Sequence, residues 1–129
     1  MSKTALSTPD APGAIGPYSQ GIGVPGLVFT SGQLPIDPKT GDMPGDIKAQ
    51  ARVALANVAA ILKAGGSDLS KAVKLTVFLT DIADFAAIND VYKEVFAGAE
   101  PYPARSAVQV AALPKPGAKV EIEAVGVTA

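Results

Sequence analysis

The segments 101-PYPARSAVQV-110 and 119-KVEIEAV-125 decide the fold of this chain. Polar and apolar residues alternate in both, which is typical of strands with one buried face. If the loop between them joins the two as an antiparallel pair, one register sets Ala107 opposite Glu121. Arg105 and Glu121 then lie near each other on one face of the sheet, so the pattern predicts a guanidinium beside a carboxylate.

The composition indicates one domain with a partly covered surface. The chain has 129 residues, enough for a single domain over residues 1–129 with a buried core. Only 18% of the residues are charged, below the roughly 25% of an average globular protein, so we expect other subunits to cover part of the surface. The net charge of -1 provides no cationic field for nucleic acid or anionic lipid.

The sequence contains neither cysteine nor histidine. Disulfides, thiolate nucleophiles and cysteine-based metal sites are therefore excluded, and so are the commonest general base and the commonest metal ligand. Any catalysis must rely on carboxylates, lysine, tyrosine, serine, arginine, backbone groups or water. This indicates an undemanding reaction, or no reaction.

The beginning of the chain shows no targeting signal. Residues Met1 to Ser7 lack the apolar core of a signal peptide, and no apolar run approaches the roughly 18 residues of a membrane span. We expect a soluble protein of the cytoplasm, or one imported intact.

Hydrophobic periodicity predicts an α+β domain. Helices are expected over Asp46–Ala64, ended by two glycines, and from Asp84 onward, with Asp84 as the N-cap. Residues 1–16 are expected to form an irregular arm. Strands are expected at 18–23, 27–33 and 73–79, before the two segments quoted above. The order strand, strand, helix, strand, helix, strand, strand indicates a mixed sheet with both helices on one face.

The apolar faces of these elements are expected to form the core. The first helix presents Ile47, Ala51, Leu55, Val58 and Leu62. The second presents Phe85, Ile88, Tyr92, Val95 and Phe96. The strand 73–79 presents Val73, Leu75, Val77 and Leu79.

Three motifs have ordinary interpretations. Residues 21–26 (GIGVPG) match G-x-G-x-x-G, but a dinucleotide site needs a helix after this pattern. A strand follows here, so we predict a turn. The aspartates of Asp37–Asp42 belong to turn chemistry rather than to a cation site. Arg52 lies on a polar stripe of the first helix and is expected to be a solvated surface charge.

Arg105 and Glu121 each allow two interpretations. An unpaired cation in a strand is energetically expensive, so Arg105 either forms a structural ion pair with Glu121 or Glu123, or binds an anion. A guanidinium holds a carboxylate through two parallel hydrogen bonds, which suits a small organic acid. Glu121 is either part of a salt bridge at the strand edge or part of a site.

Four other residues stand where a ligand can reach them, and each also has a plain structural interpretation. Ser31 and Gly32 end a strand, where glycine permits close backbone approach, or simply mark its exit. Asn89 lies one step off the apolar helix face, so it reaches a cleft or faces water. Tyr18 is either a core residue or a lid.

Four motifs together resemble the Rid family, the YjgF-type reactive-intermediate deaminases that also carry an older endoribonuclease name. They are 14-AIGPYSQG-21, 30-TSGQLP-35, 103-PARSAVQV-110 and 120-VEIEA-124. The resemblance spans residues 3–127. Arg105 makes the chain most similar to the enamine/imine deaminase branch of the family.

The resemblance implies a chorismate-mutase-like α+β fold, assembled as a homotrimer with a cleft at each subunit interface. It implies hydrolysis of 2-imino acids, such as 2-iminopropanoate and 2-iminobutanoate, to 2-oxo acids and ammonia. Their enamine precursors, among them 2-aminoacrylate, are released by pyridoxal-phosphate dehydratases. A protonated imine is already electrophilic, so positioning and acid–base help suffice, and no cofactor or metal is implied.

The resemblance also implies roles for single residues. Arg105 grips the substrate carboxylate, and Glu121 orients or activates water. Tyr18 closes over the substrate side chain. The remaining positions line the cleft: Ser31, Gly32, Asn89 and Ala107. Many family members carry cysteine at the position of Ala107, so thiol-dependent regulation is in doubt for this chain, whereas deamination needs no thiol.

Two other classes of function remain. An endoribonuclease or translation inhibitor needs acid–base groups at the scissile phosphate and a basic track for RNA, and this sequence offers neither. A non-catalytic binding protein or chaperone-like protein would use the same cleft for small carboxylic acids, and the presence of Arg105 speaks against it.

Overall fold

Six strands form one sheet in the order β1-β2-β3-β6-β4-β5. This computed structural model describes residues 2–129. Neighbouring strands run antiparallel, except that β4 and β5 are parallel. The strands are β1 (Thr4–Leu6), β2 (Gly21–Val24), β3 (Leu27–Thr30), β4 (Ala72–Leu79), β5 (Ala104–Gln109) and β6 (Val120–Val127).

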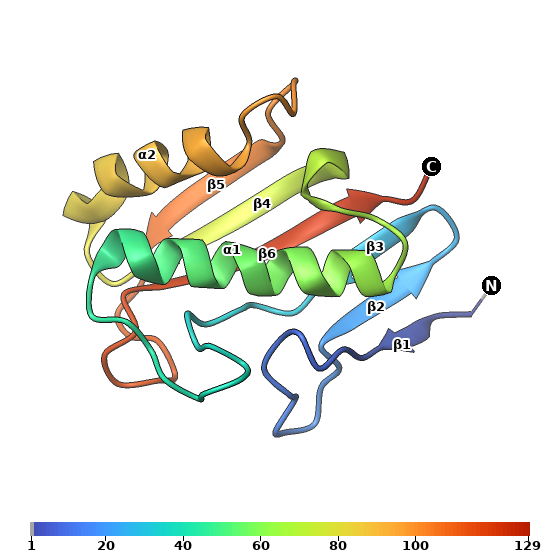
Figure 1. The fold of residues 1–129 in the computed structure, drawn as a ribbon, viewed down its shortest axis with the longest axis horizontal. Coiled ribbons are helices and arrows are strands. Elements are labelled where there is room, and N and C mark those ends of the chain that lie inside the picture. Colours follow the sequence, from blue (N-terminus) through green and yellow to red (C-terminus); the bar gives the residue numbers. More distant parts are fainter. Residues whose placement is uncertain (1) are drawn as a thin grey trace.

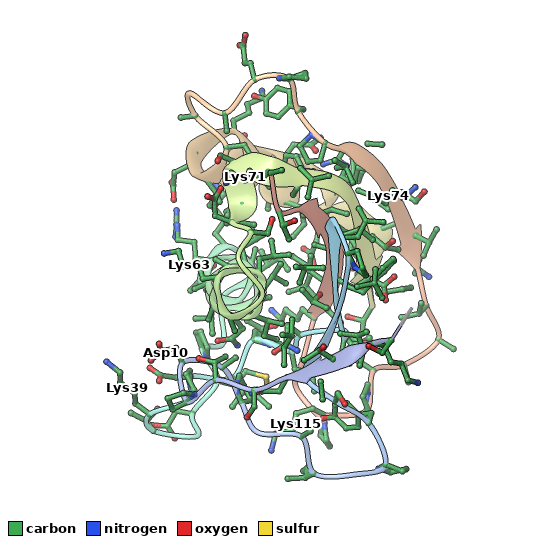
Figure 2. The ribbon with its side chains drawn as sticks, turned by 90° about the vertical axis from the view of Figure 1, so that its right-hand side faces the viewer. Asp10, Lys39, Lys63, Lys71, Lys74 and Lys115 are labelled. Atoms are coloured by element: carbon green, nitrogen blue, oxygen red, sulfur yellow. The ribbon has the colours of Figure 1, made fainter. Side chains whose placement is uncertain are left out.

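Both helices cover the same face of this sheet (Figure 1). They are α1 (Ile47–Ala64) and α2 (Phe85–Val95), and short 3-10 turns at Leu69–Lys71 and Ile82–Asp84 precede β4 and α2. In the edge-on view of Figure 2, Lys63 of α1 and Lys74 of β4 lie on opposite sides of the sheet. The mixed α+β architecture with its helices on one face is therefore confirmed, and no helix of residues 2–129 covers the second face.

Local sequence signals explain the bounds of α1. Asp46 accepts a hydrogen bond from the backbone N–H of Ala49 at 3.0 Å, which caps the first turn. The helix ends at Ala64 with Gly65 as its C-cap, and Gly66 follows with φ +88°, a conformation that favours glycine. None of the helices in residues 2–129 is long and apolar enough to cross a membrane.

The start of α2 differs from the sequence expectation. Asp84 stands at the N-cap position but makes no side-chain capping bond. Asp81 instead caps the preceding 3-10 turn, because its carboxylate accepts from the N–H of Ala83 at 2.9 Å. The buried face of α2 includes Ile88 and Tyr92 as predicted.

Two exposed ion pairs join the helices. Arg52 of α1 contacts Glu94 of α2 at 2.8 Å, and Lys48 contacts Asp90 at 3.1 Å. Arg52 is therefore a surface charge as expected, and it is also paired.

The predicted pairing of the two deciding segments is wrong. Strand β4 lies between them and pairs with β5 on one side and with β6 on the other. The physical reason is that α2 connects β4 to β5, and a helical crossover returns the chain parallel to the strand it left. The loop after β5 then passes the end of β4 and leads into β6.

This register separates Arg105 from Glu121. Leu75 of β4 pairs with Arg105 and with Ala124, so Arg105 belongs to the face under the helices. Phe78 pairs with Glu121 and with Val108, on the opposite face. The alternation within each segment was interpreted correctly, but Ala107 does not oppose Glu121, and the two charged residues lie on different faces.

Two details of the edges correct the sequence expectation. Residues 4–6 of the supposed irregular arm form β1, with Thr4 paired to Gly23, because three residues are too few to show alternation. A β-bulge between Ala72 and Lys74 turns Val73 out of the core, so that its side chain is 44% exposed.

Two motifs form turns as expected. Residues 21–26 form β2 and the turn that joins it to β3, in which Val24 pairs with Leu27 and Gly26 has φ +87°. In the loop after β3, the carboxylate of Asp37 accepts from the N–H of Lys39 at 2.8 Å, which is turn chemistry.

Candidate active site

All but one of the residues selected from the sequence fall into two pockets that share no lining residue. One pocket contains Arg105 and Asn89. The other contains Tyr18, Ser31, Gly32 and Glu121. We call them the arginine pocket and the glutamate pocket, and Arg105 and Glu121 come from opposite faces of the sheet.

The arginine pocket has a volume of about 320 Å³ and lies between α2 and the start of β5. Four residues besides Arg105 and Asn89 line it: Tyr92, Lys93, Tyr102 and Pro103. It therefore combines two cationic side chains with aromatic rings.

Arg105 is held by α2 without a carboxylate. Its NH1 group donates to Oδ1 of Asn89 at 2.8 Å. Its Cζ lies 5.1 Å from the ring centroid of Phe85 and 4.8 Å from that of Tyr92. The salt bridges found within residues 2–129 do not involve Arg105. The ion pair with Glu121 or Glu123 is thus ruled out within one chain, and the guanidinium keeps donors for an anion.

Tyr92 also places a polar group, its hydroxyl, at the arginine pocket. Its side chain is buried, and its hydroxyl has no hydrogen-bond partner in the described part of the chain. Burial raises the pKa of Tyr92, and the charge of Arg105 offsets only part of this effect. The group is therefore a neutral phenol near pH 7.

The glutamate pocket has a volume of about 480 Å³. Backbone hydrogen bonds between Gln33 and Ile122, at 2.7 and 3.1 Å, bring the segment after β3 alongside β6. A Cβ atom built on Gly32 would lie 2.9 Å from Cδ of Glu121. Gly32 therefore leaves the space that the Glu121 carboxyl group occupies, which is the close approach expected of a glycine at a strand end.

The environment of Glu121 favours its protonated form. Burial raises the pKa of the Glu121 carboxyl group, and the negative charge of Glu123 on the same face raises it further. A carboxyl group with a raised pKa can both accept and return a proton nearer neutral pH.

Tyr18 lies at the rim of the glutamate pocket with 52% of its surface exposed, so it is not a core residue. The hydroxyl of Ser31 donates to the carbonyl of Ser19 at 2.6 Å, and its N–H donates to the carbonyl of Gln20 at 2.9 Å. Ser31 thus holds the segment that carries Tyr18.

Gln20 anchors the other end of the same segment. Its buried side-chain amide donates to the carbonyls of Thr8, Ala11 and Pro12 at 3.1, 3.2 and 2.8 Å. Its Oε1 accepts from the N–H of Thr8 at 2.7 Å. One side chain therefore fixes the arm against β2, and residues 13–18 extend from this anchor as a wall of the pocket.

Ala107 is the selected residue that lines neither pocket. It is half-buried and packs against the core beside β4. Residues 2–129 also contain no group of three or more His, Cys, Asp or Glu side chains arranged to hold a metal.

The sequence interpretation missed the aromatic neighbours of Arg105. Phe85 and Tyr92 were assigned to the core face of α2, although Phe85 is 36% exposed. Phe85, Asn89 and Tyr92 follow each other at spacings of four and three, which places them on one stripe of a helix. That spacing was the available signal. Lys115 and Ile15, which line the glutamate pocket, carried no comparable signal.

Comparison with known proteins gives a consistent result. The family described as Endoribonuclease L-PSP matches residues 8–128. The 2-iminobutanoate/2-iminopropanoate deaminase of Escherichia coli K12 is 50% identical over 128 residues, which cover 98% of each chain. That of Capra hircus is 53% identical over 128 residues, which cover 98% of this chain and 91% of the relative. The crystal structure of E. coli TdcF with bound serine is 51% identical, has a TM-score of 0.93, and covers 98% of this chain and 99% of its own.

Proposed function

Because the chain belongs to the Rid (YjgF-type, endoribonuclease L-PSP) family, we propose that it is a deaminase that hydrolyses reactive 2-imino acids to 2-oxo acids and ammonia. Its substrates are 2-iminopropanoate, 2-iminobutanoate and similar imines derived from 2-aminoacrylate-type enamines. The reaction is that of the relatives named 2-iminobutanoate/2-iminopropanoate deaminase.

The observation that carries the proposal is the state of Arg105. It lines a pocket, keeps donors free and has no carboxylate partner within residues 2–129. Such a guanidinium binds the planar carboxylate that every 2-imino acid carries. The serine bound to TdcF supports a small amino-acid-like ligand for this family.

The reaction balances with water as the only co-reactant. Water adds to the carbon of the protonated imine, and the resulting carbinolamine expels ammonia as its hydroxyl becomes the carbonyl of the 2-oxo acid. We assign to Glu121 the role of accepting the proton of the attacking water. Its raised pKa suits a group that takes a proton and returns it. Positioning by Arg105 and this acid–base help are sufficient for an electrophile of this kind.

Arg105 and Glu121 lie on opposite faces of one sheet, so our proposal requires that they come from different subunits. In a homotrimer with closed cyclic symmetry, the arginine pocket of one subunit would face the glutamate pocket of the next. Asn89 would then belong to the first half of the site, and Tyr18, Ser31 and Gly32 to the second, while Ala107 lies outside the pocket on the same face of β5 as Arg105.

Exposed apolar side chains support burial against another copy. Ile15 is 94% exposed and Tyr18 is 52% exposed at the glutamate pocket. On the face without helices, Phe29 and Val108 are 41% and 44% exposed. Apolar groups in such positions are characteristic of interfaces, and the low charge content of the sequence points the same way.

The older endoribonuclease description receives less support. The chain has a net charge of -1 and contains two arginines, whereas binding to RNA phosphates depends on a cationic surface. We place the enzyme in the cytoplasm, where dehydratases release the enamine precursors.

A coupled assay tests the reaction. An amino-acid oxidase or threonine dehydratase generates the imino acid in situ, and the appearance of 2-oxo acid is followed with and without this protein. Faster appearance is expected. An unchanged rate across several imino acids would refute the deaminase proposal.

Mixed trimers test the composite site. Arg105→Ala and Glu121→Gln subunits are each expected to be inactive, but equal mixing after reversible unfolding should restore about a quarter of the parental activity, because one in four interfaces then joins two intact halves. No recovery, or a mass other than about three times 13.0 kDa by light scattering, would contradict the inter-subunit site.

A further inference from the structure

We propose that α2 positions Arg105 through a charge-neutral clamp, and that this neutrality determines the preference of the site for anions. The clamp consists of Phe85, Asn89 and Tyr92. Phe85 and Tyr92 act as positioning residues, and Asn89 acts on Arg105 rather than directly on substrate. The inference rests on the proposed function in taking a carboxylate as the ligand of Arg105.

One stripe of α2 supplies all three contacts. Asn89 Oδ1 accepts from NH1 at 2.8 Å, so one edge of the guanidinium is engaged. The rings of Phe85 and Tyr92 lie 5.1 and 4.8 Å from Cζ, within the range at which a cation is attracted to an aromatic face. These contacts restrict the guanidinium plane, and they use neither Nε nor NH2.

The same helix treats other cations differently. Asp90 and Glu94 of α2 present carboxylates to Lys48 and Arg52. Toward Arg105, α2 presents two aromatic rings and the amide of Asn89, the residue directly before Asp90. A carboxylate at position 89 would orient the guanidinium as well, but it would also neutralise it and compete with substrate.

A clamp without charge therefore orients Arg105 and leaves its positive charge unbalanced. Because the paired N–H donors of the guanidinium are oriented before the ligand arrives, less conformational freedom is lost when a carboxylate binds. The buried hydroxyl of Tyr92, which has no partner within residues 2–129, has no role in the clamp, so the ring alone is expected to carry the contribution of this residue.

The first test replaces the neutral acceptor with a charged one. Asn89→Asp is expected to raise the Kd for 2-oxobutanoate, measured by calorimetry, at least tenfold, while Tm stays equal or rises. Ala83→Asp adds the same charge at an exposed position near the start of α2, and less than a twofold change is expected. A parental Kd for Asn89→Asp, or an equal loss in the Ala83→Asp control, would overturn the proposal.

The second test addresses the rings. Phe85→Leu and Tyr92→Leu are each expected to raise the Kd for 2-oxobutanoate and KM by about three- to tenfold with a smaller effect on kcat. Tyr92→Phe restores the ring and should recover the affinity that Tyr92→Leu loses. Ile82→Ala, an exposed apolar residue before α2, is the control. If Tyr92→Phe loses as much affinity as Tyr92→Leu, the hydroxyl is the active group and the ring clamp is wrong.

A double-mutant cycle separates positioning from general stability. In an Arg105→Lys background, Phe85→Leu should change affinity less than in the parent, because the planar group it positions is absent. Equal effects in both backgrounds contradict the clamp. Calorimetry with 2-oxobutanoate needs no turnover, so a protein that binds this acid but does not deaminate would refute the proposed function and leave the clamp testable.

Discussion

Arg105 and Glu121 are surrounded by different kinds of neighbour, and in the described part of the chain neither set of neighbours includes a residue of opposite charge within ion-pair distance. Arg105 lies under α2, against two aromatic rings and an amide oxygen, and no carboxylate in residues 2–129 pairs with it. Glu121 lies on the face without helices, against a glycine and near Glu123, and no cation in those residues pairs with it.

Arg105 and Glu121 are therefore two charged side chains that have no ion-pair partner within residues 2–129. Placing a charge in partial burial without a partner costs stability, whereas the charges that α1 and α2 pair with each other are exposed. This arrangement is consistent with our proposal, in which Arg105 binds the carboxylate of the substrate and Glu121 takes the proton of the attacking water.

The largest expected effect comes from removing the basicity of Glu121. Glu121→Gln keeps the shape but loses the acid–base group, so kcat should fall about 10²–10⁴-fold. Binding of 2-oxobutanoate should persist or tighten, because a negative charge near the ligand disappears. Oxidase-coupled turnover and calorimetry measure the two quantities. Parental turnover would transfer the water-activating role to Glu123 or to a backbone carbonyl.

The same variant has a stability signature. The pKa of Glu121 is raised in the folded protein, so the carboxyl group stabilises the fold while it is protonated, and this contribution is lost as pH rises through the raised pKa. Glu121→Gln removes that loss. We expect its Tm to equal or exceed that of the parent near pH 7, with a smaller advantage at acidic pH, as thermal melts across pH will show. A lower Tm at pH 7 contradicts the assignment of burial as the dominant cause.

Arg105→Lys has the next largest expected effect, because lysine keeps the charge but cannot form two parallel hydrogen bonds to a carboxylate. Losing one hydrogen bond to a charged group costs about 1.5–3 kcal/mol, or roughly ten- to a hundredfold in kcat/KM. Arg52→Lys, in an exposed ion pair with Glu94, is the matched control and should remain near parental. If Arg105→Lys lowers Tm but leaves turnover per folded protein unchanged, Arg105 has a structural role.

Gly32→Ala is expected to have a moderate effect on kcat. A methyl group there would lie 2.9 Å from Cδ of Glu121, so the flexible carboxyl group must shift. Displacing a catalytic group by about 1 Å costs up to about a hundredfold, and we expect about tenfold with KM little changed. Gly23→Ala is the control, since its Cβ would meet the nearest atom at 3.8 Å. Equal kinetics for the two variants would show that the position of Glu121 does not matter.

The smallest expected effect concerns the exposed ion pair between the helices. Arg52→Gln removes the contact to Glu94, and exposed pairs contribute about 0–1 kcal/mol. Denaturant melts should show a change within this range that shrinks at high salt. A loss of affinity for 2-oxobutanoate in this variant would mean that the helix pair also controls the clamp on Arg105.

Much of the fold could be predicted because its signals are local. The helical spacing of Ala51, Leu55 and Val58 places α1, and the alternation around Arg105 and around Glu121 correctly divides each strand into two faces. Capping by Asp46 and the glycine stop depend only on neighbours in sequence.

The order of the strands could not be predicted in this way. Strand pairing depends on contacts between distant segments, and the alternation of β5 and β6 is equally compatible with direct pairing and with an intervening β4. The crossover through α2 carried the decisive information. The neighbours of Arg105 were missed for a related reason: an aromatic residue on a helix face has the same periodicity whether it packs in a core or against a cation.

The side-chain amide of Gln20 fixes the backbone of the arm without depending on the side chains that the arm presents to the glutamate pocket. Its bonds go to main-chain atoms of Thr8, Ala11 and Pro12, and the bond from Ser31 goes to the carbonyl of Ser19. None of these bonds uses the side chains at Ile15 or Tyr18. The backbone path of the arm therefore does not depend on these two side chains, and substitutions at Ile15 and Tyr18 are expected to leave that path unchanged.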